Sequence, residues 1–200
     1  MKPEELHSEI LYIKNIIEDS RRSLVENGIG YIIWGVIIVI GLIFQYLSLI
    51  KAVSINTNYT WAAVIGLGWI VTIFLVRKER KLIRSKYYGS HVLRATWISA
   101  SVVMTTIGFI GPVTGTLPGF SIIPLMCSVL AIAFSVSGMI YKEKLMIASG
   151  VIWWITSVIF FLWHSVHSLM IFACLMILLQ VMPGVYFYKK WRLEFSRETA

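Results

Sequence analysis

The amino-acid sequence predicts an all-α membrane protein: a bundle of six transmembrane helices, preceded by a cytoplasmic amphipathic helix. Hydrophobic residues make up 58% of the 200-residue chain, charged residues make up 14%, and the mean hydropathy is +0.78. This apolar content exceeds that of typical soluble domains. The charges gather between apolar runs of about 18–23 residues, a length that crosses a hydrocarbon core of about 30 Å. The short alternating strands of membrane barrels do not occur in the sequence.

Six apolar runs predict six membrane-spanning helices, because backbone polar groups inside a bilayer must be satisfied within their own segment. The predicted membrane domain covers residues 28–188, with spans at 28–50, 59–76, 93–111, 119–141, 145–163 and 168–188. The cytoplasmic residues 1–27 precede it and a basic cytoplasmic tail, residues 189–200, follows it. We expect no cleavable signal peptide, because the first apolar run begins only at Gly28 and is too long for one.

The distribution of Lys and Arg predicts the orientation of the spans. Of the 18 basic residues, all except Lys51 lie in or beside the N-terminal segment, the second and fourth connections and the C-terminal tail. Cytoplasmic segments of membrane proteins carry the excess of Lys and Arg. The sequence therefore predicts that both termini are cytoplasmic and that the protein is a multi-pass protein of the cytoplasmic (inner) membrane.

Two features predict how the helices pack. The fourth span contains two pairs of small residues four positions apart, which let a neighbouring helix approach closely. These pairs are Ala131 with Ser135 and Ala133 with Ser137. We therefore expect the fourth helix to be central. In the sixth span, Pro183 lacks a backbone donor and predicts a kink near the cytoplasmic face.

Residues 3–26 predict an amphipathic helix, because large apolar residues recur at steps of three and four positions. They are Leu6, Ile10, Ile13, Ile17 and Leu24. Residues 1–27 hold six acids and four bases, a net charge of −2, whereas helices that adsorb to anionic lipid are usually basic. The apolar residues are therefore the predicted binding surface for a cytoplasmic protein partner, and a helix resting on the bilayer is the alternative.

The basic segment at residues 77–90 carries six bases and one acid, a net charge of +5. It is predicted either to bind anionic lipid headgroups or to hold the acidic N-terminal helix. A simple topology signal is the alternative interpretation. The partners expected from the sequence are thus the lipid bilayer and a cytoplasmic protein or a second copy of the chain, and not nucleic acid.

His164 and His167, in the shortest outer loop, raise the question of a metal or haem site. Soft ligand atoms occur in the outer halves of the neighbouring helices, at Met126, Cys127, Met170 and Cys174. Imidazole, thioether and thiolate groups suit Cu(I), and a histidine pair can also ligate haem. However, histidines are common at the membrane interface, while Met and Cys often serve as packing residues. We therefore expect no metal and no cofactor.

The spans contain no acidic residue and no recognisable catalytic motif, so acid–base chemistry and proton coupling are disfavoured. Their mid-span polar residues are only Ser, Thr and Gln, and examples are Thr72, Ser99, Ser101, Ser135, Thr156, Ser157 and Gln180. Such residues more often connect helices than bind substrate. We expect a non-enzymatic regulatory, sensing or scaffold protein that engages a cytoplasmic partner through its N-terminal helix. A small permease or channel for a neutral or hydrophobic solute is the alternative function.

The N-terminal region also resembles a family. The stretch ILYIKNIIEDSRRSL, followed by NGIGYIIWGVIIVIGLI, resembles the opening of a group of small, uncharacterised bacterial multi-pass proteins. The matching residues are Ile13, Lys14, Ile16, Glu18, Ser20 and Arg22, and then Gly28, Gly30 and Gly35. The resemblance covers about a fifth of the chain, at its N-terminal end. It implies a bacterial inner-membrane location and no particular activity.

Overall fold

The computed structural model describes residues 28–79 and 88–198, and every regular element within these ranges is helical. Six of the described helices are long and apolar enough to cross a membrane, namely Ile29–Leu49, Thr57–Leu75, Val92–Thr114, Gly119–Tyr141, Lys144–Leu162 and Ser168–Leu193. The prediction of an all-helical fold with six candidate spans is therefore confirmed. The helices are compatible with a multi-pass membrane protein.

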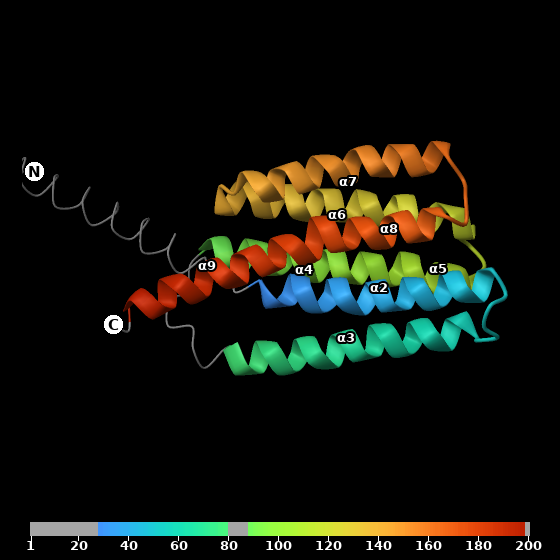
Figure 1. The fold of residues 1–200 in the computed structure, drawn as a ribbon, viewed down its shortest axis with the longest axis horizontal. Coiled ribbons are helices and arrows are strands. Elements are labelled where there is room, and N and C mark those ends of the chain that lie inside the picture. Colours follow the sequence, from blue (N-terminus) through green and yellow to red (C-terminus); the bar gives the residue numbers. More distant parts are fainter. Residues whose placement is uncertain (1–27, 80–87, 199–200) are drawn as a thin grey trace, which may run out of the picture.

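Figure 1 shows the elements in order along the chain. They are α2 (Ile29–Leu49), α3 (Thr57–Glu79), α4 (Tyr88–Thr105), η1 (Thr106–Ile110), α5 (Gly111–Thr114), α6 (Gly119–Tyr141), α7 (Lys144–Leu162), α8 (Ser168–Met176), η2 (Ile177–Val181) and α9 (Met182–Glu198). The segments η1 and η2 are π-helical turns within the third and sixth spans. The last helix continues past the predicted end at residue 188, because no Gly or Pro follows Gly184 to stop it.

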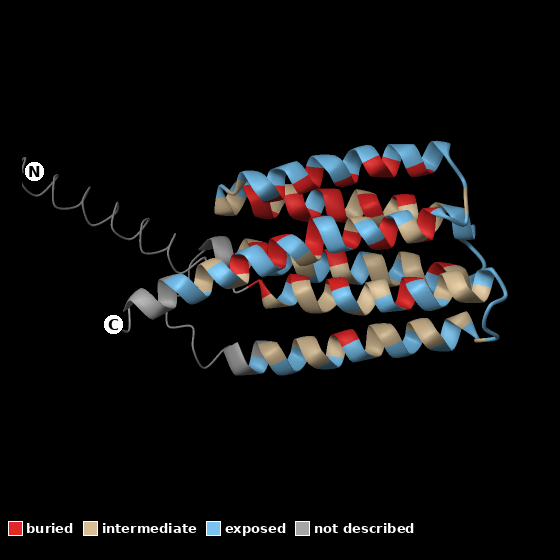
Figure 2. Cartoon of the chain, in the orientation of Figure 1, coloured by how far each residue is buried: buried red, intermediate tan, exposed pale blue. Residues whose placement is uncertain are grey.

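The helices lie side by side, with α7 at one edge of the bundle and α3 at the opposite edge (Figure 1). The helix α6 contacts α7, α4, η1 and α8, whereas α2 contacts α3, α8, η2 and α9. The contacts of α6 confirm the prediction that the fourth span is central. Burial follows the same arrangement, because the buried residues of α6 and α7 face the interior while α3 is mostly exposed (Figure 2).

The helices α6 and α7 form a tightly packed hairpin. A Cβ atom placed on Gly150 of α7 would collide with Ser135 Oγ and lie 3.1 Å from the Ala131 carbonyl oxygen. One of the two predicted small-residue pairs therefore faces α7. The other pair includes Ser137, which is fully buried and accepts a 3.0 Å hydrogen bond from Trp97 Nε1 of α4. Small residues thus hold α6 close to two neighbours at once.

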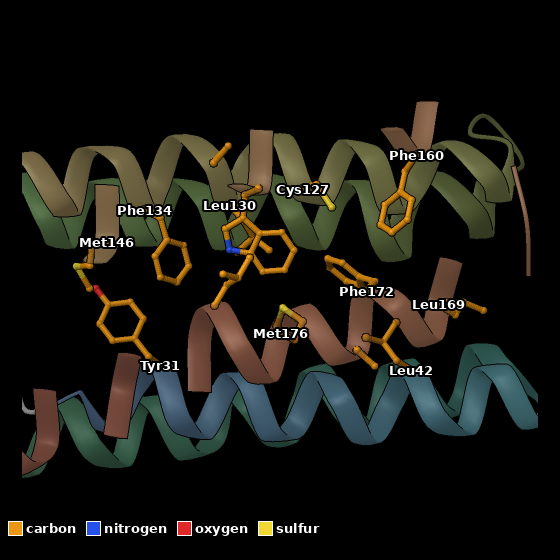
Figure 3. Packing of buried hydrophobic residues seen from close by; sticks show 14 of the residues in the cluster. Tyr31, Leu42, Cys127, Leu130, Phe134, Met146, Phe160, Leu169, Phe172 and Met176 are labelled. Atoms are coloured by element: carbon orange, nitrogen blue, oxygen red, sulfur yellow. The ribbon is translucent and has the colours of Figure 1, made fainter. Parts of the chain in front are cut away.

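The core of the bundle is built from large side chains of several helices. Phe134 of α6, Met146 and Trp153 of α7 have no exposed surface. The Trp153 ring meets Phe172 of α8 in a T-shaped arrangement with a centroid distance of 5.5 Å. Figure 3 shows Phe134 directed toward Tyr31 of α2, and the centroids of these two rings are 5.7 Å apart. This cluster joins α2, α6, α7 and α8 into one apolar interior.

Prolines shape two of the spans. Gly111 N–H donates to the Thr106 carbonyl and Met182 N–H to the Ile177 carbonyl, each five positions back, and a proline follows each donor. Since Pro183 has no N–H, the widened turn accommodates the missing hydrogen bond. The predicted disturbance of the sixth helix thus takes the form of a π-helical turn, after which α9 runs at an angle to α8 (Figure 1).

Candidate functional site

The N-terminal end of α2 contacts α9 through two glycines. Gly28 caps α2 with a φ of 66°, and a Cβ atom there would collide with the Gly184 carbonyl oxygen. A Cβ atom on Gly184 would in turn lie 3.0 Å from the Gly28 carbonyl oxygen. Neither position has room for a side chain unless the backbone moves. The point at which residues 1–27 join the bundle is therefore in direct backbone contact with the last helix.

The same contact continues one to two turns further along α2. A Cβ atom on Gly35 would lie 2.5 Å from Val181 Cγ2 and 3.7 Å from Gln180 Nε2, both in η2. Gln180 Nε2 donates a 3.4 Å hydrogen bond to the Tyr31 carbonyl, while Gln180 Oε1 is buried without a hydrogen-bond partner. The π-helical turn of the sixth span thus packs directly on α2.

We refer to Gly28, Tyr31, Gly35, Gln180 and Gly184 as the α2/α9 crossing. The Tyr31 ring extends this crossing to two further helices, because its centroid lies 5.1 Å from Trp97 of α4 and 5.7 Å from Phe134 of α6. Trp97 and Phe134 also meet edge to face, with centroids 5.6 Å apart. A displacement of α2 at the crossing would therefore be felt by α4, α6 and α9 together.

A salt bridge joins the C-terminal half of α9 to the α6–α7 turn. Lys190 Nζ lies 2.5 Å from Glu143 Oε1, and both side chains are partly exposed. Such partly exposed pairs contribute little to stability, typically less than about 1 kcal/mol. The pair shows that this part of α9 lies beside the turn between α6 and α7.

The two histidines between α7 and α8 have different neighbours. The His164 ring meets Phe120 of α6 with a centroid distance of 4.9 Å, whereas His167 Nδ1 lies 3.3 Å from the Tyr46 hydroxyl at the end of α2. Both histidines are exposed. Within the described part of the chain, no group of three or more His, Cys, Asp and Glu residues is arranged to hold a metal ion.

The four sulfur residues of the candidate metal group do not share one environment. Cys127 is fully buried in the core, while Cys174 is exposed on the surface of α8. Met126 and Met170 are half-buried and pack against the core cluster. Both cysteines are free thiols. The two cysteines therefore face opposite surroundings, one the protein interior and the other the exposed face of α8.

Two other predicted sites lie wholly or partly outside the described residues. The apolar surface of the N-terminal helix, made of Leu6, Ile10, Ile13, Ile17 and Leu24, lies entirely outside them. Residues 80–87 of the basic segment at 77–90 also lie outside them. Its first residue, Arg77, is exposed at the end of α3.

Comparisons of the chain with family models, curated proteins and solved structures find no match. The described side chains in the interior of the bundle are mostly apolar. Their buried polar members are hydroxyl groups and one amide, at Ser137, Ser149, Thr156, Ser157, Ser168 and Gln180. Among the described residues, no buried carboxylate, imidazole or basic side chain is available for proton transfer.

The α2/α9 crossing was not predicted from the sequence, although two signals for it are present. Gly28 and Gly35 are seven residues apart, so they share one face of a helix. Gly184 directly follows Pro183, at the place where a kink was expected. Finding the crossing required knowing that the first and last spans are neighbours.

Proposed function

We propose that this is a non-enzymatic regulatory membrane protein, in which α2 couples the cytoplasmic segment 1–27 and its protein partner to the helix bundle. The contact between Gly28 and Gly184 is the observation that supports this proposal. It lies one residue from the segment that would bind the partner. A partner that pulls or rotates this segment would act directly on α9.

The neighbouring η2 supports a responsive sixth span. Its π-helical hydrogen bonds are already displaced from the α-helical pattern, and Pro183 removes a further donor. Such turns interrupt helices at places where bending occurs, and they are frequent at functional sites. A shift at Gly28 would therefore bend the sixth helix at η2 more easily than elsewhere.

The same proposal includes an orientation with both termini in the cytoplasm of a bacterium and the bundle in its inner membrane. The C-terminal end of α3, the N-terminal end of α4, the α6–α7 turn and the C-terminal part of α9 lie at one end of the bundle (Figure 1). The described basic residues of these segments are Arg77, Arg94, Lys142, Lys144, Lys189, Lys190 and Arg192. Lys51 lies at the other end. An excess of basic residues favours the cytoplasmic side.

Affinity capture in mild detergent tests the proposal, by comparing the full chain with a variant that begins at residue 27. We expect a cytoplasmic protein to be captured by the full chain only. Gly184→Ala should still capture the partner. Spin labels on α9 and α7 should, however, report a different change in their separation on partner binding than they report in the parent chain. Gly30→Ala is the matched control, because a Cβ atom there meets nothing within 4 Å.

Two outcomes would contradict the proposal. The first is that the variant beginning at residue 27 captures the same proteins as the full chain. The second is that the chain, reconstituted in liposomes, conducts a neutral solute at an equal rate with and without residues 1–26. The second result would favour a permease, in which the N-terminal segment has no essential part.

A further inference from the structure

Three lysines adjoin the residues of the Glu143–Lys190 salt bridge in the sequence, at the basic end of the bundle. Lys142 precedes Glu143 in the turn between α6 and α7, Lys144 begins α7, and Lys189 precedes Lys190 on α9. All three of these lysines are exposed. We refer to Lys142, Lys144 and Lys189 as the turn lysines. The salt bridge joins the two segments that carry them, which are far apart in the sequence.

The charge of this cluster is not balanced within the described part of the protein. Glu143 is the one acidic residue whose side chain the structure describes, and Lys190 already occupies its carboxylate. The turn lysines form no ion pair with any described residue. An anion at this end of the bundle would therefore meet positive charge that no described acidic residue balances.

The short turn determines how deep these lysines lie. Only Lys142 and Glu143 separate α6 from α7, so the turn cannot extend far from the ends of two membrane-length helices. The polar headgroup layer on each side of a bilayer is about 5–8 Å thick. The side chains of Lys142 and Lys144 therefore end within this layer.

Aromatic residues mark the same depth independently. Tyr188 and Trp191 stack on α9 with a centroid distance of 6.2 Å, on either side of Lys189 in the sequence, and Tyr186 is 48% exposed. Tyr141, directly before Lys142, packs against Phe187 with centroids 6.3 Å apart. Tyr and Trp residues gather at the level of the lipid headgroups.

We propose that the turn lysines bind the phosphate group of an anionic phospholipid. The charge of the cluster complements a phosphate, and its depth matches that of the headgroup. This site differs from the basic segment at residues 77–90, because it is formed by the α6–α7 turn and α9. It does not depend on the regulatory function proposed above.

The test uses the full chain in neutral detergent, titrated with phosphatidylglycerol or phosphatidylcholine and followed by native mass spectrometry. The triple variant carries Lys142→Asn, Lys144→Gln and Lys189→Gln. Asn is chosen at position 142 because Lys142 has a φ of 54°, a left-handed conformation that Asn tolerates. We expect phosphatidylglycerol binding to weaken about fivefold for each lysine removed. Phosphatidylcholine should bind weakly to both proteins.

Two controls show whether a loss of binding is specific. Lys51→Asn removes a lysine with a similarly left-handed backbone at the opposite end of the bundle, and it should not change binding. Replacing all three turn lysines with Arg keeps the charge and should restore the affinity of the parent. If the triple variant misfolds, the single variant Lys189→Gln, at an exposed helical position, still tests the site through an expected loss of about fivefold in phosphatidylglycerol binding.

Several results would overturn the lipid site. One is an unchanged phosphatidylglycerol affinity in the triple variant, and another is equal binding of both lipids to the parent. Displacement of phosphatidylglycerol by an equal concentration of inorganic phosphate would show that no lipid surface is recognised. Binding that appears only in a variant beginning at residue 27 would show that the acidic segment 1–27 covers the lysines instead.

Discussion

Trp34 Nε1 donates a 2.8 Å hydrogen bond to Thr72 Oγ1, and this hydroxyl donates a 2.8 Å hydrogen bond to the Gly68 carbonyl. The Trp34 ring also covers Gly68, where a Cβ atom would lie 2.7 Å from the ring. Only 6% of the apolar, membrane-length part of α3 is buried, the smallest share among the six candidate spans. The contact with Trp34 is therefore a principal attachment of α3 to the rest of the bundle.

Replacing Gly68 with Ala should loosen α3. The added methyl group would have to displace the Trp34 ring and its hydrogen bond to Thr72, and such overpacking typically costs about 1–3 kcal/mol. Thermal unfolding in detergent should show a lower Tm for Gly68→Ala. Gly66→Ala, whose Cβ atom would meet nothing within 4 Å, is the control and should keep the parent's Tm. Equal Tm values for both variants would mean that Trp34 does not hold α3.

At the α2/α9 crossing, Gly184→Ala should destabilise the protein while Gly30→Ala should not. The new Cβ atom at position 184 would lie 2.9 Å from Ile32 Cγ1 and 3.0 Å from the Gly28 carbonyl oxygen. Because one of these neighbours is backbone, we expect a loss of about 1–3 kcal/mol in the free energy of unfolding. Unfolding in SDS measures this difference. A Gly184→Ala variant as stable as Gly30→Ala would contradict the close contact.

Two buried polar residues should respond oppositely to replacement by apolar ones. Ser157 Oγ donates a 2.7 Å hydrogen bond to the Pro124 carbonyl and lies 2.7 Å from Ser128 Oγ. Ser157→Ala should therefore cost about 0.6 kcal/mol or more. Gln180→Leu removes a buried oxygen that has no partner, together with one long hydrogen bond. Its stability should equal or exceed that of the parent, because unpaired buried polar groups are costly. If Gln180→Leu is less stable than Ser157→Ala in the same SDS assay, this explanation is wrong.

Cysteine labelling tests the orientation of the bundle. In a background without Cys127 and Cys174, one variant carries a single cysteine in place of Ser54, between α2 and α3, and another carries one in place of Lys144, the first residue of α7. Both positions are exposed, and they lie at opposite ends of the bundle. With both termini in the cytoplasm, an impermeant thiol reagent added to intact cells should label Ser54→Cys but not Lys144→Cys. Permeabilised cells should show labelling at both positions. The opposite pattern in intact cells would reverse the predicted topology.

The span pattern was predictable because it depends on local properties of the sequence. A run of about 20 apolar residues specifies a membrane helix whatever its neighbours are. The role of Ala131 and Ser135 was also predictable, since small residues four positions apart signal close packing on any partner. The expected disturbance at Pro183 follows from the missing N–H of a single residue. Each of these features could be recognised within one segment of the chain.

The remaining contacts were not predictable because they join distant segments. Gln180 and Tyr31 are 149 positions apart, and Trp97 and Ser137 are 40 positions apart. No pattern within one helix shows which helix will lie beside it. His164 and His167 illustrate the same limit, since their different neighbours, Phe120 and Tyr46, belong to two separate helices.

The two-residue turn between α6 and α7 has a consequence for the order of assembly during synthesis. The contacts of this hairpin join residues close in sequence, so they can form as soon as α7 has emerged. The contact between Gly28 and Gly184 must instead wait for the last helix. The first helix therefore stays without its final neighbour until translation is nearly complete, and the bundle closes only when the two ends of the chain meet.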